Sequence, residues 1–397
     1  MPRPPFLADL LDHIVDDLQD ETDVLKNCCL VSRSWVPRTR KHLFMRVILL
    51  TQAKLQSWKT TFPDSSTSPA CYVKYLFIRW PQIVEATSAE NGGWVSAFSS
   101  VVYLLLDTSR TGDDWEAAIT LTPLYGFSPV LKYLTVVLVA LPPSQFSNLI
   151  NSFPLLEGIT VNTIASFSTN NDEDFIQPSG SPALTGSLQL SMRGGMDAVV
   201  SQLLRLSNGP QFRELDLTWK SEKDVPLTTV LVEKCSSTLE SLNVTATILG
   251  TLVRYLSHTG NLPSFADPLQ SEYIDLDKAT NLQEVMFTCT LAPRWISATL
   301  RTVKHNHKKL QRVTVRLKPS PALDSIDVKR AIGVSGCQEW LELDRILANL
   351  WESHSIILSI QYTVDAEEGD GRAKNQLKRL LPESTRRTAG LIERKDR

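Results

Sequence analysis

The sequence has few cysteines, and their arrangement does not suggest a metal or disulfide site. The 397 residues include six cysteines, at positions 28, 29, 71, 235, 289 and 337, and no CxxC pair occurs. No pair of thiols lies near a suitably spaced pair of histidines. This spacing argues against a zinc module and a disulfide scaffold, and it favours a reducing compartment. The adjacent Cys28 and Cys29 point in diverging directions on a helix, so we expect them to fill space rather than to react.

The short motifs of common catalytic and nucleotide-binding sites are missing as well. No P-loop, GxGxxG, GxSxG or HExxH occurs, so we expect no catalytic residues and no cofactor. The HNHKK stretch at 305–309 places two histidines two residues apart, and such positions do not share a helix face. We therefore expect no metal site there.

Long apolar runs and an excess of charge are also absent. The most apolar stretch, YLTVVLVALPP, runs for about ten residues, whereas a membrane-spanning helix needs about 20. The start, MPRPPFLADLL, has one arginine and then meets Asp9, unlike a secretory signal. The net charge of −2 gives no basic field for nucleic acid. We expect a soluble, intracellular protein, cytoplasmic or nuclear, that binds neither membrane nor nucleic acid.

The first fifty residues contain a short helical pattern. Leu7, Leu10, Leu11, Ile14 and Leu18 recur at intervals of three and four, which predicts one amphipathic helix. A second helix is expected from residue 22 or 23, and the proline at 37 marks a break or a new first turn. A module of this size buries little surface alone, so it usually leans on a neighbouring domain or a partner.

The stretch FLADLLDHIVDDLQDETDVLKNCCLVSRSWVPRTRKHLF, residues 6–44, resembles an F-box of the kind common in fungal F-box proteins. The matching positions are Leu10, Leu11, Ile14, Leu18, Cys29, Val31, Ser32, Arg33, Trp35, Leu43 and Phe44. The start departs from the family pattern, because Phe6-Leu7 stands where Leu-Pro is usual and Asp9 replaces Glu. The resemblance covers about a tenth of the chain.

This resemblance implies a three-helix module that docks on the Skp adaptor of a cullin-RING ubiquitin ligase. The residues that it implies as adaptor-facing are Phe6, Leu7, Leu10, Leu11, Ile14, Leu30, Val31 and Trp35. From pattern alone, the same side chains also fit the interior of an N-terminal helical cap.

The remaining chain repeats an apolar-x-x-apolar-x-apolar pattern. Its central apolar residue falls at positions 76, 104, 134, 159, 188, 215, 242, 285 and 313, in steps of 28, 30, 25, 29, 27, 27, 43 and 28. Leucine-rich repeats recur every 20–29 residues or so. The long step spans an expected insertion at 257–273, and weaker copies occur in SEYIDL, ending at residue 276, and in SIILSI near 355–360.

Between these strand patterns the apolar period changes to that of a helix, as at 115–119, 146–153, 196–203 and 227–231. The predicted fold is therefore α/β. An F-box-like helical module (residues 1–50) precedes an irregular leucine-rich-repeat-like solenoid (51–364), with parallel strands inside and helices outside. A polar loop is expected at 166–182 and a charged, mobile tail at 365–397.

Three tyrosines precede the central apolar residue of three successive strands. Tyr75, Tyr103 and Tyr133 thus predict a ladder of rings on the concave face, which Phe77 and Leu105 extend two residues further along their strands. Exposed tyrosines are common at the centres of protein interfaces, so these five residues are the candidate target-binding site. The alternative is cross-strand stacking that only stiffens the sheet.

Together these patterns predict a substrate-recognition adaptor of an SCF-type (Skp-cullin-F-box) ubiquitin ligase that holds an unidentified target protein. The first alternative is a repeat scaffold whose helical start has lost adaptor binding, which the altered Phe6-Leu7 entry favours. An enzyme ranks third, because no set of nucleophile, base or metal ligand is evident.

Overall fold

The computed structural model forms two compact units, residues 1–183 and 184–397. It describes residues 5–64, 67–79, 93–108, 121, 124–125, 127–138, 143–163, 184–192, 196–206, 208–219, 224–246, 273–289, 294–317, 326–354, 356–362, 381 and 392–394. The expected helix at 115–119 and the expected loop at 166–182 lie outside these residues, as does all but the last residue of the expected insertion at 257–273.

The first unit begins with three helices, α1 (Pro5–Asp17), α2 (Thr22–Val31) and α3 (Val36–Leu43). Pro37 lies in the first turn of α3, where its missing N–H removes no helical hydrogen bond. The side chains of Val15, Leu25, Cys28 and Thr39 are buried. Cys28 therefore fills space as expected, while the half-buried Cys29 lies with its Sγ 2.8 Å from the Thr39 Oγ1.

One carboxylate ties α1 to α3. Asp16 accepts hydrogen bonds from Arg38, at 2.6 Å from its Nε and also through Nη2, and its Oδ1 lies 2.7 Å from the His42 Nε2. The Arg38 guanidinium, with a smaller contribution from His42, holds the pKa of Asp16 well below its usual range. The charged form of Asp16 therefore stabilises the contact between the two helices.

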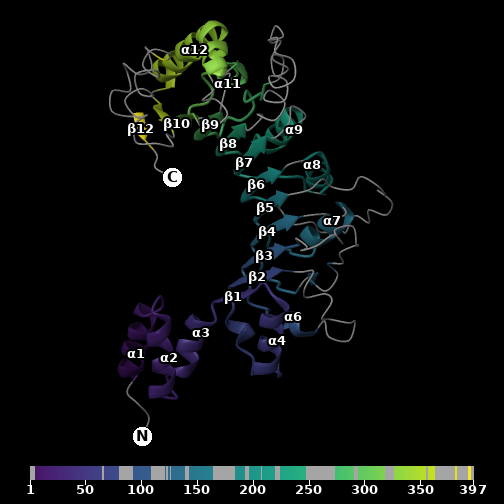
Figure 1. The fold of residues 1–397 in the computed structure, drawn as a ribbon, viewed down its shortest axis with the longest axis vertical. Coiled ribbons are helices and arrows are strands. Elements are labelled where there is room, and N and C mark those ends of the chain that lie inside the picture. The colour runs from purple at the N-terminus through teal and green to yellow at the C-terminus, as the bar shows by residue number, and fades with distance from the viewer. Residues whose placement is uncertain are drawn as a thin grey trace. The chain divides into compact units, whose positions relative to one another are not determined.

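The sheet of the first unit is parallel, and its strands follow chain order. They are β1 (Arg46–Leu49), β2 (Tyr75–Arg79), β3 (Tyr103–Asp107), β4 (Tyr133–Leu138) and β5 (Gly158–Thr163). Helices α4 (Gln52–Thr61), α6 (Gly93–Ser96) and α7 (Pro143–Asn151) lie along one side of it, with a 3-10 turn at Pro69–Tyr72 (Figure 1). We call the opposite side the open face.

The second unit repeats this arrangement. Its parallel strands are β6 (Ser187–Met192), β7 (Glu214–Trp219), β8 (Ser241–Ala246), β9 (Glu284–Cys289), β10 (Arg312–Leu317), β11 (Ile357–Tyr362) and β12 (Ile392–Arg394). Its helices are α8 (Met196–Leu204), α9 (Asp224–Cys235), α11 (Arg294–Leu300) and α12 (Ile326–His354). Figure 1 shows these helices on one side of the strands, which leaves an open face here too.

The predicted repeat register is confirmed within each unit. In the first unit Leu76 pairs with Leu104, Leu104 with Leu134, and Leu134 with Ile159. The second unit pairs positions 188, 215, 242, 285 and 313 in turn, and the weak copy near 355–360 is strand β11, where Leu358 continues the row. These central residues are fully or almost fully buried. Each row therefore forms one line of a continuous α/β core.

Backbone carbonyls join successive coils, where a coil is one strand with the connection that follows it. The carbonyl just before a strand accepts two N–H groups from the next coil, as the Lys74 oxygen does from Val102 at 2.9 Å and from Tyr103 at 3.0 Å. The residues with this double acceptor are Met45, Lys74, Val102 and Lys132 in the first unit and Gly186, Arg213, Glu240 and Gln283 in the second. This main-chain bond recurs although the repeats carry no regular Asn or Cys at the turn.

An aromatic cluster connects the end of α3 to the first coils of the sheet. The Phe44 ring packs edge-on against Trp58, with centroids 6.0 Å apart, and against Phe62 at 5.7 Å. Trp58 in turn contacts Phe98 at 5.5 Å. The three-helix module is therefore packed onto the repeats of the first unit, because these rings share one apolar cluster.

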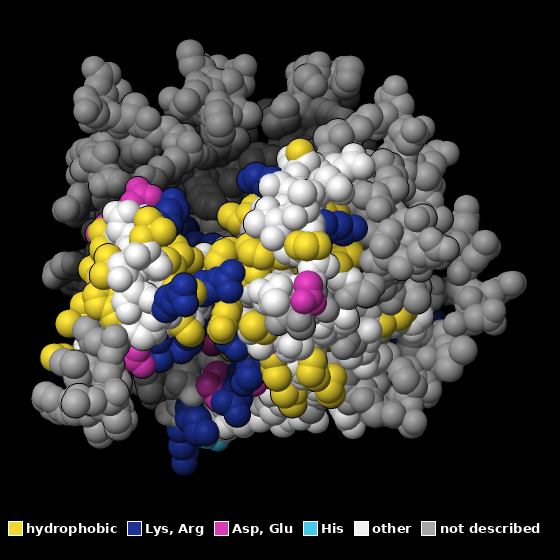
Figure 2. All heavy atoms as spheres, turned by 90° about the horizontal axis from the view of Figure 1, so that it is seen from below, with side chains coloured by type: hydrophobic (Ala, Val, Ile, Leu, Met, Phe, Trp, Pro, Cys, Tyr) yellow, Lys and Arg dark blue, Asp and Glu magenta, His cyan; other side chains and the backbone are white. Residues whose placement is uncertain are grey.

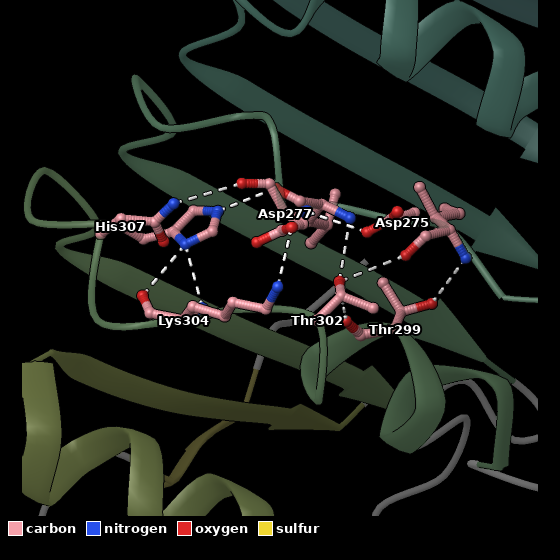
Figure 3. Close-up of polar contacts among 9 residues, drawn as sticks. Asp275, Asp277, Thr299, Thr302, Lys304 and His307 are labelled. Atoms are coloured by element: carbon pink, nitrogen blue, oxygen red, sulfur yellow. Dashed lines mark hydrogen bonds and ion pairs between the residues drawn. The ribbon is translucent and has the colours of Figure 1, made fainter.

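The weak repeat copy ending at residue 276 does not form a strand. Residues 273–276 instead run between α9 and α11 as an irregular segment in which Ile274 and Leu276 are fully buried. Figure 3 shows how side chains hold it: the Thr299 and Thr302 hydroxyls accept the N–H groups of Ile274 and Leu276. This weak copy therefore does not add a strand to the sheet, because the N–H groups of its two buried apolar residues donate to threonine hydroxyls.

His307 completes this support. Its fully buried ring lies with Nε2 2.8 Å from the Leu276 carbonyl, while Nδ1 accepts the N–H of Lys304 at 3.0 Å (Figure 3). Both ring nitrogens therefore hold the backbone, whereas the neighbouring His305 is exposed.

Strands β1 and β12 differ from the sequence-based boundaries. β1 lies inside the segment assigned to the helical module and pairs with β2 from Arg46 to Leu49. β12 lies inside the predicted tail and pairs with β11, where Ile392 is opposite Ile360. In the described part of the chain, no helix is both long and apolar enough to cross a membrane.

Candidate functional site

Helices α1 and α2 expose large apolar side chains. Leu30 is 85% exposed, Val31 70%, Leu10 47% and Ile14 44%. We call these four residues the helical patch. On the left of Figure 2, hydrophobic side chains gather over α1 and α2, beside basic side chains. These four side chains do not form the interior of the module, and large apolar side chains left exposed in this number on a small module are typical of interaction sites.

The other residues implied by the F-box resemblance lie on the same helices or next to them. Trp35 is half-buried at the start of α3, where its carbonyl accepts hydrogen bonds from the N–H and the hydroxyl of Thr39. Phe6, Leu7 and Leu11 lie within α1, and their side chains are outside the described part of the structure. The resemblance did not include Val24, which is 41% exposed on α2.

The predicted tyrosine ladder forms in part on the open face of the first unit. Tyr75 is opposite Tyr103 and Tyr103 is opposite Tyr133 in the sheet register. The rings of Tyr75 and Tyr103 lie 6.1 Å apart, and Phe77 lies 5.9 Å from Tyr103. Leu105 is half-buried beside them. These five predicted residues therefore share one face, and the Tyr103 ring makes tilted contacts with the rings of Tyr75 and Phe77.

Tyr133 takes a different contact. Its hydroxyl donates to Glu157 at 3.4 Å, and Lys132 pairs with the same carboxylate at 2.7 Å. The Tyr103 hydroxyl lies 2.8 Å from the Thr135 Oγ1. Tyr75 and Tyr133 remain 39% and 41% exposed, so the face offers aromatic surface, and the hydroxyls of Tyr103 and Tyr133 already have partners.

Strand β1 adds two residues to this surface that the sequence analysis missed. Ile48 is 43% exposed and lies opposite Phe77, and the Arg46 guanidinium lies 5.8 Å from the centre of the Tyr75 ring. The stretch FMRVIL at 44–49 contains the repeat pattern, so the periodicity was a usable signal. We call Ile48, Tyr75, Phe77, Tyr103, Leu105 and Tyr133 the aromatic face.

The open face of the second unit is polar instead. Asp216 accepts hydrogen bonds from Asn243 at 3.0 Å and from Gln189 at 3.3 Å. Burial raises the pKa of Asp216 above its usual value, and the positive charge of Arg316 offsets part of that rise. Further along, the Arg312 Nη1 pairs with the Glu284 Oε1 at 3.1 Å.

A hollow of about 410 Å³ lies on this polar face, over strands β8 to β11. Its lining residues are Ser241, Asn243, Glu284, Val285, Met286, Arg312, Thr314, Arg316, Ile357 and Ser359. The sequence analysis assigned no role to these residues. They come from four separate coils, and only the strand register brings them together.

The described residues include no cluster of three or more His, Cys, Asp and Glu side chains able to hold a metal ion. Burial raises the pKa of the Cys235 thiol to about 11, so this thiol stays protonated near neutral pH. No protein-family model matches the chain, and no curated protein matches it significantly.

Proposed function

We propose that this chain is a substrate-recognition adaptor of an SCF-type ubiquitin ligase. In this proposal the three-helix module is an F-box that docks on the Skp adaptor, and the repeats form a leucine-rich-repeat-like solenoid that holds a target protein. No side chain of the chain makes or breaks a bond. The chain acts by proximity, because it raises the effective concentration of the target at the ligase.

The observation that carries the proposal is the helical patch. Leu30 and Val31 are the most exposed large apolar residues on α2, and they belong to the stretch that resembles an F-box. A partner that buried one of these side chains would gain about 1.5–3 kcal/mol of hydrophobic free energy from it. Their exposure therefore fits a surface that is covered in a complex.

Two further features support the target-binding half. The aromatic face presents tyrosine and aliphatic side chains on regular strands, which suits the anchors of a protein interface. The cluster of Phe44, Trp58, Phe62 and Phe98 packs the module against the coils that carry this face. A bound target would thus be held at a fixed position relative to the module.

Adaptor binding is tested with the double variant Leu30→Asp, Val31→Asp. Because both side chains are exposed, we expect the variant to fold, and we expect it to lose co-purification with a recombinant Skp adaptor. The matched control is Leu155→Asp, since Leu155 is 51% exposed and lies outside the module. Unchanged co-purification of the double variant would contradict the F-box assignment.

Target binding is tested with the triple variant Tyr75→Ala, Tyr103→Ala, Tyr133→Ala. We expect affinity-purified complexes to lose the target while the Skp adaptor stays bound. If the rings only stiffen the sheet, the target will remain and only the unfolding midpoint will fall. Circular dichroism checks that the variant is folded.

The alternative is a repeat scaffold without a ligase role. It predicts that the unaltered chain captures a target and no Skp adaptor. The departure from the usual Leu-Pro at Phe6-Leu7 favours it.

A further inference from the structure

The hollow on the open face of the second unit has small polar residues at its base. Ser241, Thr314 and Ser359 come from three strands, and their short side chains leave the space that larger ones would fill. Their hydroxyls can donate and accept hydrogen bonds. The long side chains of Glu284, Arg312 and Arg316 line the same hollow. The hollow is therefore suited to a polar group.

Two arginines from one strand line this space. Arg312 and Arg316 lie on either side of Thr314 in β10, so all three side chains share the open face. Arg312 is half exposed, and its Nη1 forms an ion pair at 3.1 Å with the Oε1 of Glu284, which is half exposed as well. A guanidinium has five N–H donors, and an exposed ion pair of this kind stabilises the fold by at most about 1 kcal/mol. Arg312 can therefore rotate toward a second anion with little loss of folding stability.

Asn243 adds an unsatisfied group. Its Nδ2 donates to Asp216 at 3.0 Å, while its buried Oδ1 accepts no hydrogen bond from the described residues. A buried acceptor without a partner costs about 1–3 kcal/mol. An N–H group from a ligand at this end of the hollow, after a small rotation of the carboxamide, would remove that cost.

We propose that this hollow binds a carboxylate side chain, Asp or Glu, of an extended segment of the target protein. Arg312 and Arg316 hold the carboxylate, the hydroxyls in the hollow donate to it, and a peptide N–H reaches Asn243. The inference rests on the proposed function in that it takes this face as part of the target-binding surface.

The charge balance favours a carboxylate over a phosphate. The lining carries two arginines and one glutamate, and the carboxyl of Asp216 accepts a hydrogen bond from Asn243 and interacts with the charge of Arg316. This leaves at most one surplus positive charge. A carboxylate brings one negative charge, whereas a phosphate monoester brings 1.5–2 or so near neutral pH.

The test measures binding of fluorescein-labelled Gly-Ser peptides to the purified full-length chain by fluorescence anisotropy. One peptide carries a central Glu-Glu pair, and the others carry Gln-Gln, Lys-Lys or a phosphoserine. We expect the Glu-Glu peptide to bind and the Gln-Gln peptide to bind about ten- to a hundredfold more weakly, because charge-assisted hydrogen bonds are lost. Added salt should weaken the Glu-Glu complex.

Variants of the arginines locate the site. Arg316→Ala and Arg312→Ala should each weaken Glu-Glu binding about tenfold or more. Arg345→Ala should leave it unchanged, since Arg345 is exposed on α12. If Arg316→Ala does not fold, the double variant Arg312→Glu, Arg316→Glu gives an independent test. This variant should bind the Lys-Lys peptide more tightly than the Glu-Glu peptide.

Equal binding of the Glu-Glu and Gln-Gln peptides overturns the proposal, and so does an equal loss in Arg345→Ala. Binding of the phosphoserine peptide alone overturns the choice of a carboxylate. None of these outcomes touches co-purification with the Skp adaptor. A failure of the peptide site and a failure of the proposed function are thus distinguishable.

Discussion

Replacing His307 by alanine should destabilise the second unit strongly. The change removes a fully buried ring whose Nε2 lies 2.8 Å from the Leu276 carbonyl and whose Nδ1 accepts the Lys304 N–H at 3.0 Å. The part-buried N–H of Lys304 loses its acceptor, while the Leu276 carbonyl keeps the N–H of Ala279 at 2.8 Å. Loss of one such partner costs about 1–3 kcal/mol, and the cavity left by the buried ring adds to it. We therefore expect the free energy of unfolding to fall by about 2–5 kcal/mol.

The effect should be local before it is global. Hydrogen–deuterium exchange followed by mass spectrometry should show faster exchange in peptides covering 273–283 and 302–310, by about tenfold for each 1.4 kcal/mol lost. His307→Asn should fall between the native chain and the alanine variant, because the Asn Oδ1 can occupy the position of Nδ1 and keep the Lys304 bond. His305→Ala is the matched control, since His305 is exposed two residues away.

The reasoning is refuted if His307→Ala and His305→Ala give the same urea midpoint and the same exchange pattern. In that case apolar burial and the hydroxyls of Thr299 and Thr302 would hold the irregular segment, and the two ring contacts would add no stability.

Further measurements bear on the module, the core and the helical layer. Arg38 and His42 hold the pKa of Asp16 low, so the stabilisation is complete above the unfolded value of about 3.9 and is lost as pH falls toward the folded value. Asp16→Asn should therefore flatten the fall in urea midpoint between pH 5 and pH 2 or so. Leu104→Ala, at a fully buried position, should cost about 2–5 kcal/mol in the same assay, whereas Leu155→Ala should cost little. Trp219→Phe removes the indole N–H that donates to Thr228 at 2.8 Å, and it should cost about 1–3 kcal/mol and lower the tryptophan fluorescence.

The period of the apolar residues predicted the sheet register because each coil must bury the same two strand positions. Leu76, Leu104 and Leu134 were matched from sequence spacing alone, and the structure pairs them. The same argument put three tyrosines on one face. It did not predict that Tyr133 contacts Glu157 instead of a neighbouring ring, since that depends on side-chain rotation.

The misses have identifiable causes. The strand β1 carries the repeat pattern, but the sequence analysis began the repeats only after residue 50 and so placed this stretch in the helical module. Residues 273–276 alternate like a strand, and their hydrogen-bond partners lie 25 or more residues away on Thr299, Thr302 and His307. The hollow was not foreseen because its shape depends on the sizes and directions of side chains from four coils, which the strand register alone does not give.

At the start of most strands, one carbonyl accepts two N–H groups from the next coil. This arrangement affects how far the lengths of the connections can vary. Each such carbonyl sets the starting point of the next coil by main-chain contacts alone, with no side chain involved. The number of residues between two successive strands can then differ, provided that the next strand begins with its N–H groups at the preceding coil's carbonyl. Steps of 25 and of 43 residues therefore lead to equally aligned strands. Connections on the helical side can lengthen or shorten over generations while the surface presented by the strands keeps its spacing.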